Sequence, residues 1–174
     1  MRYHLYSRIL HWLMAIVIIF LLGLGIYMTK FISSDSESRM AIYNLHKSFG
    51  VLALILIAIR LVNRFINKAP ALPATIIKIE AIAAHLAHFL LYLLMIIIPL
   101  SGYLMSNSFG YPVNFFGFQM PFLVMQNPEL GKIFAEIHEI TAYLLIAMVI
   151  LHVCAVIKHR FFDKAENDVL KRMI

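Results

Sequence analysis

Charged residues and cysteine are both scarce in this chain. Asp, Glu, Lys and Arg together make up only 14% of its 174 residues, whereas 62% are hydrophobic and the mean hydropathy is +0.85. This apolar share lies far above that of ordinary soluble domains. Composition alone therefore indicates an integral membrane protein that is surrounded by lipid.

The single cysteine, Cys154, lies inside an apolar run. One cysteine excludes a disulfide framework, a thiolate metal cluster and a C-x-x-C-H motif for covalent attachment of a cofactor. The formal net charge of +6 does not point to nucleic acid, because the basic residues stand in short segments between apolar runs. In that position they orient a membrane protein, and we expect no nucleic-acid partner.

Four apolar runs are long enough to cross a bilayer, whose core of about 30 Å needs roughly 20 helical residues. They cover residues 10–28, 46–62, 83–105 and 135–157. The first run follows Arg2 and Arg8 like a signal peptide, but it is long and lacks a small-residue cleavage site, which favours a retained helix. The sequence predicts an all-α, integral membrane four-helix bundle that forms a single domain over residues 1–174.

The distribution of Lys and Arg predicts that both termini are cytoplasmic. Eleven of these residues lie at the N-terminus, in the second connection and in the C-terminal tail, whereas only four lie in the first and third connections. Basic residues accumulate on the cytoplasmic side of membrane proteins. The third connection, residues 106–134, is rich in aromatic residues and is expected to lie on the outer interface as a lid.

Eight histidines in so apolar a chain are the most informative anomaly, because ionisable groups at membrane depth are costly and usually functional. His138 and His152 are 14 residues apart, which is about 21 Å of helical rise and nearly four whole turns, so both point to one face. His11 begins the first helix at the inner side, and His46 begins the second helix at the outer side. Matching depths therefore pair His46 with His138 and His11 with His152.

Two pairs of facing imidazoles in a four-helix bundle predict two bis-histidine haem sites, stacked across the membrane. The same 14-residue spacing carries His11 to Gly25, beside the outer haem, and His46 to Arg60, at the depth of the inner haem. Gly25 and Gly50 are expected to let a porphyrin approach the backbone. Arg60 is a candidate partner for a haem propionate.

Other readings of the histidines stay open. A lone intramembrane histidine also serves as a hydrogen-bonded packing residue. His85 and His88 begin the third helix at the inner side and compete, in second rank, as inner-haem ligands. His159 lies seven residues beyond His152, past the inner haem, where a quinone headgroup needs a hydrogen bond and a proton carrier. A plain surface histidine beside Lys158 and Arg160 is an equally good interpretation of His159.

Several short motifs together resemble the bacterial cytochrome b561 family over essentially the whole chain. In order, they are Tyr6-Ser7-Arg8, His11-Trp12, Leu45-His46 with Gly50, Arg60-Leu61, Ala84-His85-Leu86-Ala87-His88 with Leu91-Tyr92, Phe116-Gly117, His138-Glu139, Leu151-His152, His159 and the tail from Leu170 to Met173. Each motif is weak alone, and their order and spacing are specific.

The resemblance implies a protein of the bacterial inner membrane with two haem b groups, whose ligands match His11, His46, His138 and His152. For the best-known members it also implies a superoxide:ubiquinone oxidoreductase. Superoxide would reduce the outer haem, and ubiquinone would take the electrons near His159 and His88. Beside His46, the basic residues Lys30, Arg39 and Lys47 would attract such an anion at the outer end.

Two rival functions remain at this point. Haem subunits of hydrogenases and formate dehydrogenases share a related architecture, so the chain is alternatively a haem b anchor that passes electrons between quinone and a protein redox partner. A proton or metal-ion transporter that uses the histidines as a relay needs a polar pathway. The helices offer few acidic residues for one, with Glu80, Glu136 and Glu139 near helix ends.

Overall fold

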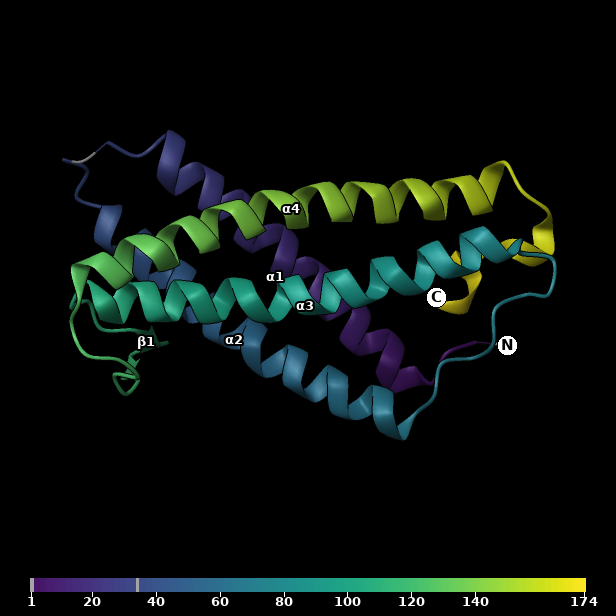
Figure 1. Ribbon diagram of the computed structural model, residues 1–174, viewed down its shortest axis with the longest axis horizontal. Helices are drawn as coiled ribbons and strands as arrows, with labels where there is room; N and C mark the ends of the chain where they lie inside the picture. The colour runs from purple at the N-terminus through teal and green to yellow at the C-terminus, as the bar shows by residue number, and fades with distance from the viewer. Residues whose placement is uncertain (1, 34) are drawn as a thin grey trace.

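Four long helices make up most of the computed structural model, which describes residues 2–33 and 35–174. They are α1 (Leu5–Lys30), α2 (Arg39–Ile66), α3 (Lys78–Ser108) and α4 (Pro128–Phe161), and all four are long and apolar enough to span a membrane. The predicted all-α membrane bundle is therefore confirmed. Helices α1 and α2 form one antiparallel pair and α3 and α4 another, and the two pairs cross at an angle (Figure 1).

The packing between these pairs is uneven. Helix α4 lies along α3, whereas its backbone comes near α1 and α2 at few places at most among the described residues. A small apolar core joins α1 to α2 and consists of Met14, Val17, Ala53, Leu56 and Ile57. The space between α4 and the α1–α2 pair is therefore left to side chains that reach across it.

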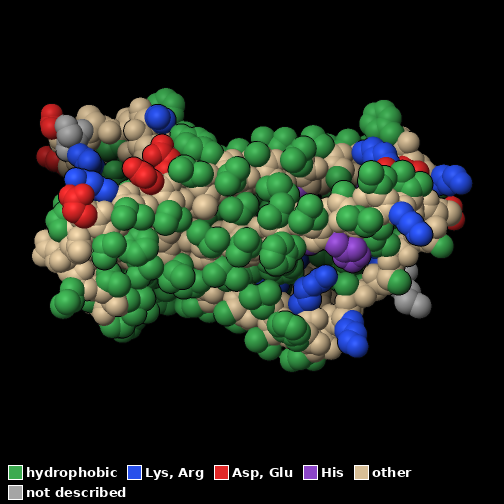
Figure 2. All heavy atoms as spheres, viewed as in Figure 1, with side chains coloured by type: hydrophobic (Ala, Val, Ile, Leu, Met, Phe, Trp, Pro, Cys, Tyr) green, Lys and Arg blue, Asp and Glu red, His purple; other side chains and the backbone are tan. Residues whose placement is uncertain are grey.

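The surface matches a position in lipid. Hydrophobic side chains cover the middle of the molecule, while Lys and Arg gather towards its ends (Figure 2). Many large apolar side chains on the helices are exposed, including Ile16 at 65% and Leu151 at 62%. Such exposure is unfavourable in water and favourable in hydrocarbon, so this belt is the lipid-facing surface.

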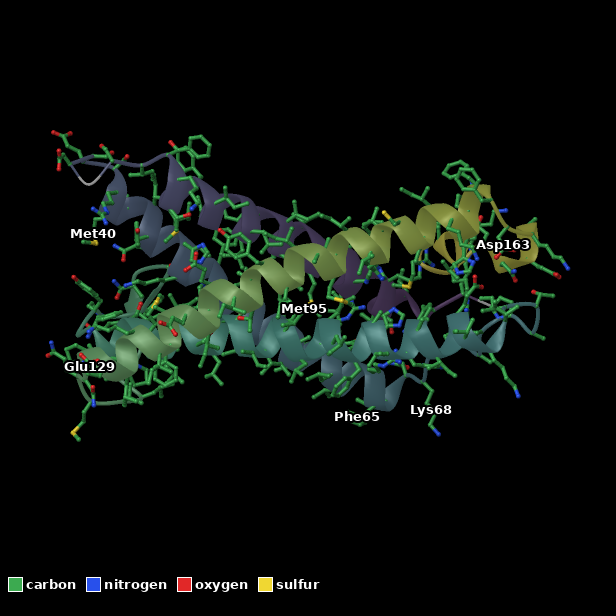
Figure 3. All side chains as sticks on the ribbon, turned by 45° about the horizontal axis from the view of Figure 1, so that its top comes forward. Met40, Phe65, Lys68, Met95, Glu129 and Asp163 are labelled. Atoms are coloured by element: carbon green, nitrogen blue, oxygen red, sulfur yellow. The ribbon has the colours of Figure 1, made fainter. Side chains whose placement is uncertain are left out.

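The two ends of the bundle differ, and we name them by what they carry. Both chain termini and the connection between α2 and α3 lie at one end, the terminal end (Figure 1). The connection between α3 and α4 lies at the other end, the hairpin end. Met40 and Glu129 mark the hairpin end, Lys68 and Asp163 the terminal end, and Met95 the middle (Figure 3). That the terminal end faces the cytoplasm stays a prediction from the Lys and Arg distribution.

The helices extend beyond the predicted spans. Helix α4 begins at Pro128 because the Asn127 side chain accepts hydrogen bonds from the backbone N–H groups of Glu129 and Leu130. The predicted third connection, residues 106–134, is therefore shortened to residues 109–127. Hydropathy marks the part of a helix that crosses lipid, whereas capping residues mark where the helix ends.

The charged residues near these ends are also helical. We counted Arg60 and Arg64 with the second connection, although Arg60 falls within the predicted span of residues 46–62; both lie within α2, and Lys158 lies within α4. Long basic side chains can keep their charge near a membrane surface while their backbone continues the helix. The correction matters for Arg60, because a helical position fixes the direction of its side chain.

A short hairpin covers one end of α2. Strands β1 (Asn114–Phe115) and β2 (Phe118–Gln119) pair antiparallel across a turn in which Phe116 and Gly117 have φ of 47° and 99°. The buried Ser48 hydroxyl donates to the Asn114 carbonyl at 2.9 Å and accepts from the Phe116 N–H at 3.1 Å. The aromatic connection thus lies over the bundle as the predicted lid does, and its depth in the lipid interface stays a prediction.

The terminal end is closed by the tail of the chain. The Trp12 indole N–H donates to the Met173 carbonyl at 2.9 Å, and the Tyr3 N–H donates to the Arg172 carbonyl at 3.0 Å. The Arg172 guanidinium donates to the carbonyls of Pro70 and Ala71, each at 2.8 Å. These contacts fasten the α2–α3 connection and the tail to the start of α1.

We expect Ser48→Ala to release the hairpin from α2. The variant leaves the Phe116 N–H without its side-chain acceptor and removes the donor to Asn114, and a buried unsatisfied group costs about 1–3 kcal/mol. Chymotrypsin should cut within residues 109–127 faster than in the wild type. Thr141→Val is the control, because among the described residues that hydroxyl bonds to backbone carbonyls of α4 alone. Equal cleavage rates in Ser48→Ala and the wild type would contradict this anchoring role.

Candidate functional site

The histidines that were paired by depth are brought together in space. At the hairpin end, the rings of His46 on α2 and His138 on α4 have centroids 6.2 Å apart and planes at 78°. At the terminal end, the rings of His11 on α1 and His152 on α4 have centroids 6.3 Å apart and planes at 57°. Both pairs bridge the space that the helix backbones leave open between α4 and the α1–α2 pair.

The separation of the rings fits one metal ion between each pair. A metal–imidazole nitrogen bond is about 2.0 Å and the nitrogen lies about 1.1 Å from the ring centre, so two axial imidazoles have centroids about 6.2 Å apart. Two imidazoles that hydrogen-bonded to each other directly would have centroids only about 5 Å apart. The observed values of 6.2 and 6.3 Å therefore match joint ligation of an iron ion.

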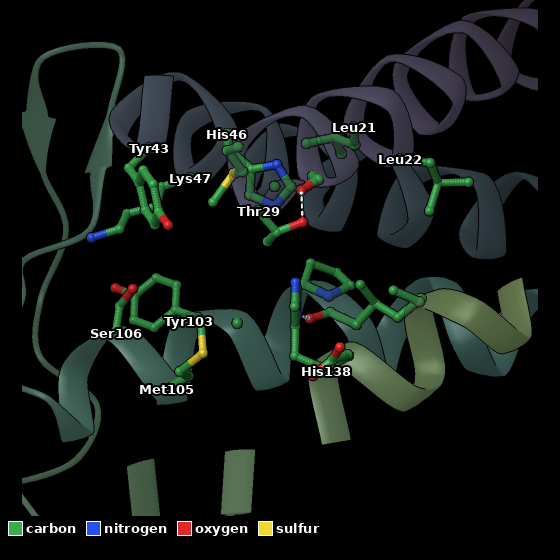
Figure 4. A pocket seen from close by; sticks show the side chains of 18 of the residues that line it. Leu21, Leu22, Thr29, Tyr43, His46, Lys47, Tyr103, Met105, Ser106 and His138 are labelled. Atoms are coloured by element: carbon green, nitrogen blue, oxygen red, sulfur yellow. Dashed lines mark hydrogen bonds between the residues drawn. The ribbon is translucent and has the colours of Figure 1, made fainter. Parts of the chain in front are cut away.

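A large cavity surrounds the pair at the hairpin end. Its volume is about 1040 Å³ and residues of all four helices line it. His46 and His138 face each other from its opposite walls (Figure 4). A cavity of this size lies at the upper end of the range for ligand sites and has room for a large planar cofactor.

The polar atoms of these two rings suit a metal ligand. The His138 Nδ1 lies 2.8 Å from the Ile98 carbonyl, which can only accept, so Nδ1 carries the proton and the Nε2 lone pair is left for a metal. The buried His46 Nδ1 has no hydrogen-bond partner among the described residues. A buried polar nitrogen without a partner costs free energy, and a group bound in the cavity could supply the missing partner.

Three glycines lie around this histidine pair, and the sequence analysis did not single out the one that comes closest to a ring. A Cβ at Gly25 would lie 3.5 Å from the His46 ring, which is ordinary contact, and a Cβ at Gly50 would meet nothing within 4 Å. A Cβ at Gly102 would lie 2.9 Å from two atoms of the His138 ring, so Gly102 makes room for that ring. All three glycines line the cavity. Only knowledge of how α3 packs on α4 reveals the role of Gly102.

Arg60 lies beside His11 at the terminal end. Its Nη2 is 3.0 Å from the His11 Nδ1, and its Nε donates to the Tyr92 hydroxyl at 3.1 Å. The Arg60 Nη1 is buried and has no hydrogen-bond partner among the described residues. The structure thus puts Arg60 at the depth expected for an inner haem, and its contact with a propionate stays a prediction.

His88 is the rival ligand at this end. Its ring centroid lies 5.7 Å from that of His152, closer than the separation for two ligands of one iron, whereas His11 at 6.3 Å matches it. His85 makes no ring contact with either histidine in the part of the chain that the structure describes. The geometry therefore favours His11 over both residues of α3 as the partner of His152.

His159 has a carboxylate partner that the sequence interpretation did not identify. The His159 Nδ1 lies 2.9 Å from the Asp163 Oδ2, and the His159 side chain is only 12% exposed. The backbone N–H of Lys164, the Asn167 side chain and His159 lower the pKa of Asp163 to about 2. The four-residue spacing of the pair was visible in the sequence, although the helix ends at Phe161, before Asp163.

The basic residues expected to attract an anion are divided in the structure. Arg39 and Lys47 line the cavity at the hairpin end, whereas Lys30 ends α1 outside the lining. The Lys47 ammonium donates to the Pro112 carbonyl at 3.1 Å. Glu37 and Glu139 also line the cavity and offset the two positive charges. The formal charges of these four lining residues therefore cancel, and attraction of an anion at this end stays a prediction.

Comparison with known proteins gives a consistent result over the whole chain. The family model described as prokaryotic cytochrome b561 matches residues 2–174. Cytochrome b561 homolog 2 from Escherichia coli (strain K12) is 32% identical in an alignment of 174 positions that covers 99% of this chain and 91% of that protein.

Two further relatives are more distant. Cytochrome b561 homolog 1 from the same organism is 23% identical over 164 residues, which are 94% of this chain and 92% of that protein. A probable superoxide oxidase, CybB, from Yersinia pestis is 24% identical over 164 residues, which are 94% of this chain and 91% of that protein. The likeness thus spans nearly the full length of each relative.

We expect Gly102→Ala to disturb the histidine pair at the hairpin end. The added methyl group would lie 2.9 Å from the His138 ring, which the Ile98 carbonyl holds in place, so the ring must move. Haem content of the purified variant should fall, with the pair at the terminal end unaffected. Gly23→Ala is the matched control, because a Cβ there meets nothing within 4 Å. Full haem content in Gly102→Ala would show that the close approach is unimportant.

Proposed function

Because this chain belongs to the prokaryotic cytochrome b561 family, we propose that it carries electrons through two haem b groups from superoxide at the hairpin end to ubiquinone at the terminal end. Membership of the family makes it a haem-binding electron-transfer protein and an oxidoreductase. With four membrane-spanning helices, it is a multi-pass protein of the bacterial inner membrane. The number of haems, the donor and the acceptor are our proposal.

The observation that carries the proposal is the matched separation of the two histidine pairs, 6.2 and 6.3 Å between ring centroids. Helix α4 contributes one ligand to each pair, since His138 and His152 are 14 residues apart, about 21 Å along the helix. This rise is shorter than the bilayer core of about 30 Å, so both pairs lie within the membrane, each nearer one face. Two separate sites along one helix suit electron transfer across the membrane.

Bound haem supplies one-electron redox chemistry, and the protein supplies position and access. His46 and His138 would hold the group at the hairpin end, and His11 and His152 the group at the terminal end. The Ile98 carbonyl fixes the orientation of His138, and Gly25, Gly50 and Gly102 keep the walls of the cavity free of side chains. Apolar residues make up most of the cavity lining around the pair at the hairpin end.

Superoxide as the donor is supported by a distant relative and by the cavity at the hairpin end. The relative from Yersinia pestis is a probable superoxide oxidase. Oxidation of superoxide removes one electron and yields dioxygen, so no proton acceptor is needed at this end. Lys47 and Arg39 offer positive charge to the anion within the lining. Since Glu37 and Glu139 offset that charge, attraction would be local to Lys47 and Arg39.

Ubiquinone as the acceptor is supported by the pair of His159 and Asp163 at the terminal end. Reduction of ubiquinone to ubiquinol takes two electrons and two protons, hence two superoxide ions for each quinone. With a pKa near 2, Asp163 stays ionised at neutral pH and holds the proton on the His159 Nδ1. The His159 Nε2 is then left without a partner, and once it takes up a proton from water it can donate a hydrogen bond to a quinone oxygen and pass that proton on. His88, beside His152, is a second candidate contact for the quinone.

We predict two haems per chain, and we predict that replacing any one of the four ligand histidines removes one particular haem. Purified protein should show a b-type spectrum, and His46→Ala or His138→Ala should remove one haem while His11→Ala or His152→Ala removes the other. His85→Ala and His88→Ala serve as controls and should retain both. A wild-type protein with one haem, or loss of a haem in His88→Ala but not in His11→Ala, would refute this assignment.

We further predict that superoxide reduces the haems of the isolated protein and that ubiquinone reoxidises them. His159→Gln should slow reoxidation roughly a hundredfold or more, the range of a lost proton donor, and leave reduction by superoxide unchanged. Asp163→Asn should act in the same direction, because it removes the acceptor for the His159 Nδ1 proton.

Stopped-flow absorbance measures both steps separately. Haems that stay oxidised when superoxide is added would show that superoxide is not the electron donor. Reduction that requires a co-purifying protein would favour the alternative function, a haem b anchor for a larger oxidoreductase. Unchanged reoxidation in His159→Gln would reject the proposed quinone contact.

A further inference from the structure

The two histidine pairs differ in the charge that surrounds them. At the hairpin end, His138 bonds to a neutral backbone carbonyl, and the cavity lining contains two basic and two acidic residues, Arg39 and Lys47 with Glu37 and Glu139. At the terminal end, the Arg60 guanidinium lies 3.0 Å from the His11 ring. The first site is balanced in charge, and the second has a fixed positive charge in contact with a candidate ligand.

The positive charge of Arg60 is not neutralised by a neighbouring acid. None of the ion pairs between described residues includes Arg60. Its other contacts are with Tyr92: Nε donates to the hydroxyl at 3.1 Å, and the guanidinium carbon lies 5.8 Å from the ring centroid. Its Nη1 is buried without a partner. In such surroundings a charge acts over several ångströms with little screening.

We propose that the charge of Arg60 raises the reduction potential of the haem at the terminal end above that of the haem at the hairpin end. An added electron makes a haem more negative by one charge, and a nearby fixed cation stabilises that reduced state. Electrons entering at the hairpin end therefore move downhill to the terminal end. This inference rests on the proposed two-haem function and adds what sets its direction.

The effect comes from the charge of Arg60 and not from its hydrogen bond to His11. A guanidinium only donates, so in this arrangement the His11 Nδ1 accepts and Nε2 carries the proton. Ligation through Nε2 would leave the proton on Nδ1, and Arg60 could then no longer donate to the ring. Tyr92 still holds the Arg60 Nε, so the charge stays beside the site.

A redox titration of the purified, haem-loaded full chain tests the proposal. The wild type should show two components, and Arg60→Gln should lower only the component of higher potential. At a fixed ambient potential we expect the ratio of reduced to oxidised haem in that component to fall about tenfold, or 59 mV for one electron. Arg60→Lys should keep most of the potential because it keeps the charge.

Arg64→Gln is the matched control for this measurement. Arg64 lies one turn further along α2, with its guanidinium carbon 5.9 Å from the same Tyr92 ring, and it therefore tests loss of a similar charge further from His11. Its effect on the higher component should be clearly smaller than that of Arg60→Gln. An equal effect of both variants would overturn the specific role of Arg60.

Different results of the redox titration would overturn the role of Arg60 and the two-haem function. Two components that both stay unchanged in Arg60→Gln, or a shift of the lower component, would overturn the inference alone. A single component in the wild type would overturn the two-haem function itself.

If Arg60→Gln loses haem, variants that keep one histidine pair each can decide the order of the two reduction potentials. The chain with His46→Ala keeps only the terminal-end site, and the chain with His11→Ala keeps only the hairpin-end site. We expect the first to titrate at the higher potential. The reverse order would overturn the proposal.

Discussion

The separation of imidazole rings across the gap between α4 and the α1–α2 pair is the constraint on which the rest of the structure depends. Helix α4 packs along α3 and stands away from α1 and α2, while α3 itself packs on α2, so side chains and a bound group would join α4 to the α1–α2 pair. His138 and His152 reach across this gap to His46 and His11, at 6.2 and 6.3 Å between ring centroids. In lipid, where apolar burial gives helices little reason to associate, such ligation would also contribute to holding the halves together.

The surroundings of each pair then give the two sites different tasks. At the hairpin end, Gly102 and the Ile98 carbonyl fix one ring beside a wide cavity whose charged residues balance. At the terminal end, Arg60 adds a positive charge against His11, and His159 with Asp163 lies beyond the pair where protons are available. In the proposed function, the hairpin end would admit a small donor and the terminal end would stabilise electrons and supply protons, so the asymmetry of the bundle suits a directed reaction.

Much of this arrangement was predictable from the sequence. Hydropathy located all four helices, and the 14-residue spacing of His138 and His152, with His11 and His46 at opposite ends, was enough to pair the rings.

Features that depend on packing between helices were not predictable. Gly102 matters only because α3 lies against α4, Asp163 contacts His159 only through the fold of the chain after Phe161, and Glu37 and Glu139 offset Lys47 and Arg39 only once all four line one cavity. Helix ends also escaped prediction, because caps such as Asn127 lie outside the apolar runs.

Electron paramagnetic resonance of the oxidised protein tests the central claim most directly, because it reports the axial ligands of ferric haem. Two haems with paired histidine ligands should give two low-spin signals of bis-imidazole type. One signal should disappear when His46 or His138 is replaced, and the other when His11 or His152 is replaced. A high-spin haem, a signal with a methionine or thiolate ligand, or one signal that survives removal of all four histidines would contradict it.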